Sequence, residues 1–86
     1  MAKQDILTRF TDYLGKTRDY AASPSVMTGL SLDETSTRLR QLALTELKDV
    51  PLSRCLEQLR LAIGKQDASR INQLLEEMED CLQNHA

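Results

Sequence analysis

The chain has 86 residues, of which 28% are charged, and a formal net charge of −2 at pH 7. A chain of this length forms one domain at most, and its small core makes stability marginal, which favours an oligomer. The acidic balance and the small aromatic content (3%) argue against a nucleic-acid-binding surface built on basic and stacking side chains.

The first predicted helix begins at about Lys3, and two positions are possible for its end. Apolar residues recur at the spacing of one helical face, namely Ile6, Leu7, Phe10, Tyr13 and Leu14. Gly15 is a typical helix stop, which favours a helix over 3–14. Tyr20 continues the same apolar stripe, however, so a longer helix over 3–22 is the alternative.

Residues 23–30 are the one clear interruption of the helical pattern, and we expect a loop there. Pro24 and Gly29 are residues that interrupt helices, and small polar residues fill much of the remaining segment. Three residues of the segment are apolar, which suggests that this loop packs on another surface and is not a free linker: Val26, Met27 and Leu30.

The second predicted helix covers residues 32–49. Ser31 and Glu34 have the spacing of a capping box, in which the two side chains satisfy backbone amides at the helix start. Pro51 pushes the preceding residue out of the helical conformation and therefore ends this helix. Its buried stripe consists of Leu39, Leu42, Ala43 and Leu47.

Two further helices are predicted over 51–63 and 68–83. Gly64 stops the first of them, and Asp67 is the N-cap of the second. Because the connection has only about four residues, the two helices lie antiparallel as a helical hairpin. Their apolar stripes are Leu52, Cys55, Leu56, Leu59, Ala62 and Ile63 in the first, and Ile71, Leu74, Leu75, Met78, Cys81 and Leu82 in the second.

The sequence therefore predicts an all-α fold, a small bundle of three to four helices with a C-terminal antiparallel helical hairpin. We expect a single helical domain over 1–86. The longest uninterrupted apolar run covers 61–63, which is far too short to span a membrane. No signal-type segment is visible, so we expect a cytoplasmic protein.

The residues that catalysis or metal binding requires do not occur at the necessary spacings. His85 is the single histidine, and we expect it in a frayed chain end, where it is a poor base and a poor ligand. Cys55 and Cys81 each fall on an apolar stripe, and we expect both to be reduced; a bridge between them is the alternative. We therefore expect no enzyme, no metal site and no cofactor.

Leu44 and Leu61 lie off the apolar stripes of their helices. At about 100° per residue, Leu44 falls away from the stripe of 32–49, and Leu61 lies nearly opposite Leu52. Helices that are apolar on more than one side are typical of elements packed between two others, so we expect these leucines to contact a partner. The simpler alternative is that they are single exposed leucines.

The helix over 68–83 offers a second candidate surface. Its apolar stripe includes Leu75 and Met78, and the neighbouring residues are acidic: Glu76, Glu77, Glu79 and Asp80. This stripe would lie in a groove of the partner, and the carboxylates would direct the approach to a basic surface. The alternatives are a stripe that belongs to the core and a solvated acidic face.

These observations predict a small cytoplasmic protein–protein interaction module (an adaptor, chaperone or regulator) that binds a partner protein through helical apolar surfaces. We expect a homodimer, because so small a core needs additional stabilisation. The alternative is a small nucleic-acid-associated transcriptional regulator with a basic patch around Arg38 and Arg40. Retention on heparin that weakens steeply with salt would distinguish this alternative.

Overall fold

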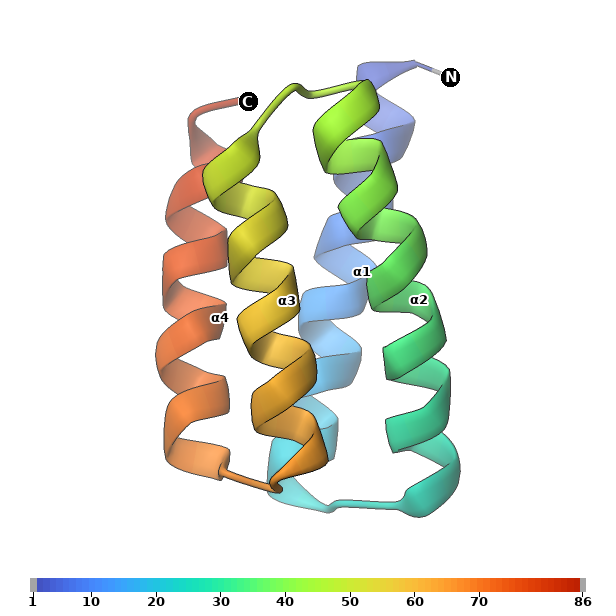
Figure 1. Cartoon of the computed structure of the whole chain (residues 1–86), viewed down its shortest axis with the longest axis vertical. Helices are drawn as coiled ribbons and strands as arrows, with labels where there is room; N and C mark the ends of the chain where they lie inside the picture. The colour runs from blue at the N-terminus through green and yellow to red at the C-terminus, as the bar shows by residue number, and fades with distance from the viewer. Residues whose placement is uncertain (1, 86) are drawn as a thin grey trace.

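The computed structural model describes residues 2–85, which form a bundle of α-helices joined by short connections (Figure 1). The helices are α1 (Lys3–Ala22), α2 (Val26–Thr45), α3 (Val50–Gly64) and α4 (Ala68–Gln83). The all-α fold class is confirmed, and so is the expectation that the last two helices form an antiparallel hairpin. The bounds of α4 are those predicted from the sequence.

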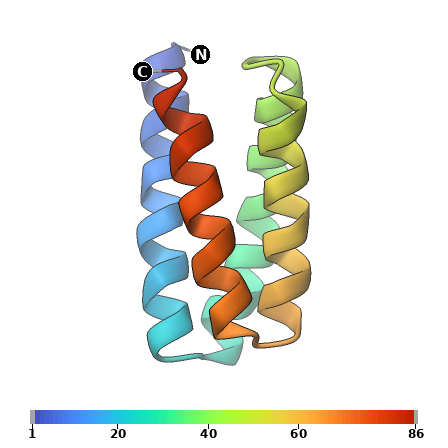
Figure 2. The ribbon, with the colours of Figure 1, turned by 90° about the vertical axis from the view of Figure 1, so that its left-hand side faces the viewer.

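Consecutive helices run in opposite directions along a bundle that is 32 Å long (Figure 1). Each helix packs on two neighbours: α1 and α3 each contact α2 and α4. A side view separates the bundle into two layers, one of α1 with α4 and the other of α2 with α3 (Figure 2). The beginning of α1, the end of α4 and the connection between α2 and α3 lie at the same end of the bundle.

The core contains side chains from all four helices. Those that are almost completely buried include Phe10, Tyr13, Leu32, Leu39, Leu56, Leu59, Leu74 and Met78. Burial of one such side chain contributes about 1.5–3 kcal/mol to stability, so the four helices hold together mainly through this shared core. The three aromatic residues of the chain are buried, as their position on the first stripe predicted.

Helix α1 has the longer of the two predicted extents, because it continues through Gly15. Gly15 does not adopt the left-handed conformation that a glycine helix stop requires. A single glycine in a helix costs about 1 kcal/mol relative to alanine. The burial of Thr17 and Tyr20 on the continued stripe outweighs this cost. Pro24 then ends the helical segment.

The prediction of a loop over 23–30 is wrong, because α2 begins at Val26 and only three residues separate it from α1. Gly29 lies inside α2, where this helix passes close to α1. A Cβ atom at Gly29 would lie 3.4 Å from Cε2 of Tyr20. The glycine therefore marks a close approach of two helices, a role that the sequence alone cannot distinguish from a break.

The predicted capping box is also wrong, because Ser31 and Glu34 lie in the interior of α2. Glu34 instead pairs with Arg38 one turn later, with 3.5 Å between the carboxylate oxygen and the guanidinium nitrogen. Helix α2 also ends at Thr45, earlier than the predicted limit of residue 49. Asp49 is excluded from α2 because its side chain caps the following helix.

Aspartates cap the two helices of the C-terminal hairpin. Asp49 and Asp67 each accept a hydrogen bond from the backbone amide three residues later, at 3.0 Å and 3.1 Å. The predicted N-cap at Asp67 is thereby confirmed. The residues before these caps, Lys48 and Gln66, have left-handed φ angles of 53° and 54°. Neither connection uses glycine at its left-handed position, although glycine is the residue that adopts this conformation at least cost. Gly64 is instead the last residue of α3.

Candidate protein-binding surface

Among residues 2–85, large apolar side chains are exposed on only one of the two layers of the bundle. Among the described residues there are six, of which four lie on α2 and two on α3: Val26, Met27, Leu30, Leu44, Val50 and Leu61. We call the outward side of this layer the α2–α3 face. A concentration of exposed apolar side chains on one side of a protein is typical of a binding surface.

The most exposed part of this face is the beginning of α2. Val26, Met27 and Leu30 have exposed fractions of 79%, 82% and 67%, and we call these three residues the end patch. Leu32 and Leu39 are buried in the core and fix the rotation of α2, which turns the end patch toward solvent. The chain itself therefore leaves these residues largely uncovered.

A groove of about 320 Å³ lies beside the end patch, where the beginning of α2 meets the end of α3. Val26, Leu30 and Ile63 contribute apolar side chains to its lining. The ring of Tyr20 also lines it, and the tyrosine hydroxyl donates a hydrogen bond to the backbone oxygen of Ile63 at 3.3 Å. The volume is at the lower limit for ligand pockets, so the groove suits side chains of a partner better than a separate small molecule.

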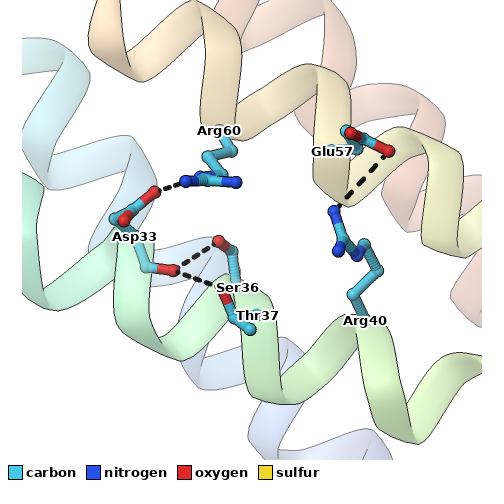
Figure 3. Close-up of polar contacts among 6 residues, drawn as sticks. All are labelled: Asp33, Ser36, Thr37, Arg40, Glu57 and Arg60. Atoms are coloured by element: carbon cyan, nitrogen blue, oxygen red, sulfur yellow. Dashed lines mark hydrogen bonds and ion pairs between the residues drawn. The ribbon is translucent and has the colours of Figure 1, made fainter.

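Two ion pairs connect α2 and α3 in the centre of the face (Figure 3). Arg60 of α3 donates a hydrogen bond through Nε to the carboxylate of Asp33. Further along the face, Nη1 of Arg40 lies 3.5 Å from Oε2 of Glu57. Each helix therefore carries one acidic and one basic residue of these pairs, and each residue faces the opposite charge on the other helix. The two ion pairs lie between the apolar ends of the face.

The structure exposes both leucines that the sequence predicted to lie off the core. Leu44 has an exposed fraction of 46% and Leu61 of 54%. It does not bring them together, because the C-terminal ends of α2 and α3 lie at opposite ends of the bundle (Figure 1). The two leucines are thus separate points of one face, and the central ion pairs lie between their levels.

The predicted surface on α4 is not present in the form suggested. Leu75 and Met78 are buried, so their stripe belongs to the core, as the alternative interpretation held. Glu79 pairs with Arg18 of α1. The remaining acidic candidates are exposed and lie on the layer opposite the α2–α3 face: Glu76, Glu77 and Asp80.

His85 is held by α3 and not frayed, which corrects the prediction for this end of the chain. Nε2 of His85 lies 2.7 Å from Oδ2 of Asp49, and both side chains are largely buried. The same carboxylate group caps α3 through its other oxygen. The Asp49 carboxylate therefore holds both the start of α3 and the imidazole of His85, and this contact packs the bundle end.

The described residues offer no further chemistry at the thiols or for a metal ion. Burial raises the pKa of Cys55 to about 12, and burial also raises the pKa of Cys81. Both cysteines are free, and thiols with raised pKa values are poor nucleophiles at neutral pH. Within residues 2–85, no group of three or more histidine, cysteine, aspartate or glutamate side chains could hold a metal ion.

The sequence interpretation missed four residues of this face, namely the end patch and Val50. The predicted loop over 23–30 includes Val26 and Leu30, and Val50 enters the prediction only as the residue before Pro51. A signal was present: Val26 and Leu30 precede Leu44 by 18 and 14 residues, which places all three on one side of a continuous helix. The assumed break after Pro24 concealed this pattern.

No family model, curated protein or solved structure matches this chain. Within the part of the chain that the structure describes, no helix is sufficiently long and apolar to cross a membrane. The functional interpretation therefore rests on the chemistry of the α2–α3 face.

Proposed function

We propose that this chain is a small protein–protein interaction module, an adaptor, chaperone or regulator, that binds a partner protein through the α2–α3 face. One observation carries the proposal: all six exposed large apolar side chains of residues 2–85 belong to these two helices. Apolar surface exposed to water is unfavourable, and contact with a partner would remove it from water.

The charges on this face favour a protein partner over nucleic acid. Arg38 pairs with Glu34, and Arg40 pairs with Glu57, so carboxylates of the same chain offset the two arginines of the suspected basic patch. Binding to phosphates requires basic groups that can replace the counterions of the nucleic acid. A face that alternates apolar residues with internal ion pairs lacks this surplus of positive charge.

We further propose that the module acts in the cytoplasm as a homodimer. Its two free cysteines are in keeping with a reducing compartment. Self-association would cover apolar surface that a monomer leaves exposed, and it would add the stabilisation that a small core needs.

Site-specific photo-crosslinking in cells tests the use of this face. A photoreactive amino acid replaces Met27 or Leu61, both of which are more than half exposed, and the exposed Asn72 on α4 is the matched control. We expect protein adducts from the two positions on the α2–α3 face and none from the control, since only atoms close to a partner react. The adducts are detected by gel mobility and identified by mass spectrometry.

Three patterns of adducts would contradict the proposal. Equal labelling at all three positions would indicate random collision, and labelling at Asn72 alone would assign binding to the opposite layer. Adducts that nuclease treatment removes would favour the nucleic-acid-associated regulator.

A further inference from the structure

One stripe of α2 has apolar residues at equal distances from its centre and opposite charges on its two halves. Residues at alternating intervals of three and four lie along the outer edge of α2 that faces α3: Leu30, Asp33, Thr37, Arg40 and Leu44. This interval averages 3.5 residues, which is the repeat of helices that pack along a common seam. Leucines occupy both ends, opposite charges lie inside them, and Thr37 lies at the centre.

Each position of this stripe is accessible to a second molecule. Leu30 and Leu44 are among the exposed apolar residues, and the side chains of Asp33 and Arg40 have exposed fractions of 46% and 34%. The hydroxyl of Thr37 donates a hydrogen bond to the backbone oxygen of Asp33 at 3.2 Å, so it needs no other partner (Figure 3).

An antiparallel copy of the stripe is complementary to the original. When two copies cross at Thr37, Leu30 of each copy meets Leu44 of the other, and Asp33 of each meets Arg40 of the other. Apolar residues therefore face apolar residues, and each carboxylate faces a guanidinium. This is the arrangement of an isologous contact, in which a two-fold axis relates identical surfaces.

Helix α3 extends the same complementarity. Arg40 pairs with Glu57 and Asp33 with Arg60 within one chain, so Glu57 lies toward Arg40 along the bundle and Arg60 lies toward Asp33. The two-fold axis that brings Asp33 to Arg40 of the second copy also brings Arg60 to Glu57 of that copy. Four charges of each face thus meet opposite charges, and they specify one direction of packing.

The other antiparallel arrangement, with α2 of one copy on α3 of the other, faces Asp33 with Arg60 and Arg40 with Glu57, so it differs in its apolar contacts and in its response to the charge swap below. The groove beside the end patch places Leu30 at the level of Ile63 and Gly64. Ile63 is buried and Gly64 has no side chain, so the exposed apolar side chain nearest to Leu30 would be Leu61, two residues earlier on α3. The α2-on-α2 arrangement supplies Leu44 at that position.

We propose that the occupant of the α2–α3 face is a second copy of this chain, with the two α2 helices antiparallel and crossing at Thr37. This inference rests on the proposed function and specifies its partner. A standard protein interface covers about 800 Å² of each partner, which is about 15% of the 5440 Å² surface of this chain. The outward side of one layer of the bundle, which is 32 Å long and 21 Å across, is large enough for an interface of this area.

A charge swap inside the chain tests the arrangement without removing an intrachain ion pair. The double variant Arg40→Glu with Glu57→Arg keeps the pair between α2 and α3 in reversed form. In the proposed dimer the new carboxylate at position 40 faces Asp33, and the new guanidinium at position 57 faces Arg60. Facing like charges oppose association, so we expect the dimer dissociation constant to rise by about 100-fold or more. Sedimentation equilibrium over about three decades of concentration measures it.

Two further variants complete the test. Adding Asp33→Arg and Arg60→Asp to the double variant restores opposite charges at every proposed contact, so the quadruple variant should dimerise like the wild type. Exchanging the charges of the Arg18–Glu79 pair, by Arg18→Glu with Glu79→Arg, is the matched control on the opposite layer. It should leave the dissociation constant unchanged.

Circular dichroism establishes that each variant is folded, and Leu30→Lys provides an independent variant should a charge swap unfold the chain. Leu30 is 67% exposed, so this change should weaken the dimer by at least about 10-fold while the helices persist. A wild type that is monomeric at all concentrations would overturn the inference, as would a folded double variant that dimerises normally or a folded quadruple variant that does not.

The two proposals fail in different ways. A monomeric wild type whose Met27 and Leu61 positions crosslink to a different protein would retain the proposed binding of a partner protein, and it would remove the homodimer and the second copy as occupant of the α2–α3 face. A monomer that gives no adducts from either position would contradict both.

Discussion

At the scale of single residues, Tyr13 is the least satisfied side chain of the core. Its exposed fraction is 1%, and its hydroxyl is the one buried side-chain polar atom without a hydrogen-bond partner among the described residues. Burial also raises the pKa of Tyr13 to about 12. The ring supplies apolar contact to the core, while the hydroxyl loses its hydration without replacement.

Tyr13→Phe should therefore raise the free energy of unfolding by about 1 kcal/mol, since it keeps the ring and removes the uncompensated hydroxyl. Tyr20→Phe is the matched control, because that hydroxyl donates to the backbone oxygen of Ile63. It should lower stability by about 1 kcal/mol. Urea unfolding followed by circular dichroism measures both changes. A loss of stability in Tyr13→Phe would show that the hydroxyl is hydrogen-bonded.

At the scale of helices, the capped helix starts are those of α3 and α4. Asp67→Ala removes a carboxylate that accepts the amide hydrogen of Arg70, and it should cost about 1 kcal/mol. Ser31→Ala is the control, because Ser31 is an exposed interior residue of α2. Alanine has a better helix propensity than serine, so this change should leave stability unchanged or raise it by about 0.5 kcal/mol. If Ser31→Ala lowered the free energy of unfolding as much as Asp67→Ala, α2 would begin at the predicted capping box.

The second half of the fold was predictable because its signals are local. Asp67 precedes an apolar stripe directly, and the short connection leaves only an antiparallel hairpin as a solution. The first half depends on contacts that are distant in sequence. Gly15 and Gly29 are both typical of helix interruptions. However, the burial of Tyr20 favours the continuation of α1 through Gly15, and the ring of Tyr20 lies against Gly29. Local propensity is a weak prior where tertiary packing opposes it.

The candidate face was predictable only in part for the same reason. Leu44 and Leu61 lie in segments that are helical both in the prediction and in the structure, so their angle to the core stripe could be calculated from spacing. The end patch could not be found while its residues were assigned to a loop. The pairing of α2 with α3 through Asp33 and Arg60 also required the structure, because 27 residues separate these side chains.

At the scale of the whole molecule, the buried Cys55 thiol and Tyr13 hydroxyl make the stability of the fold depend on pH in the alkaline range. Burial raises the pKa of Cys55 from 9.0 to about 12 and that of Tyr13 from 10.0 to about 12. The folded state therefore retains protons that the unfolded state releases above about pH 9. Their contribution to stability is fully present below pH 9 and is lost as the pH rises toward 12.

The free energy of unfolding should consequently decrease steadily between about pH 9 and 11, the highest pH suitable for urea titrations. The double variant Cys55→Ala with Tyr13→Phe removes both groups and should show a clearly smaller slope over this range. The slope is the decisive quantity, because loss of the Cys55 hydrogen bond to the backbone oxygen of Leu74 also changes absolute stability. Equal slopes in the two proteins would assign alkaline unfolding to other groups.

The order in which the helices pack also has a kinetic consequence. Three of the four interhelical contacts join consecutive helices, and only the contact of α1 with α4 joins the two ends of the sequence. Chains rich in such local contacts cross their folding barrier in microseconds to milliseconds, because little loop-closure entropy is lost before contacts form. The docking of α1 against α4 encloses the longest loop, so it has the largest loop-closure cost of the four contacts.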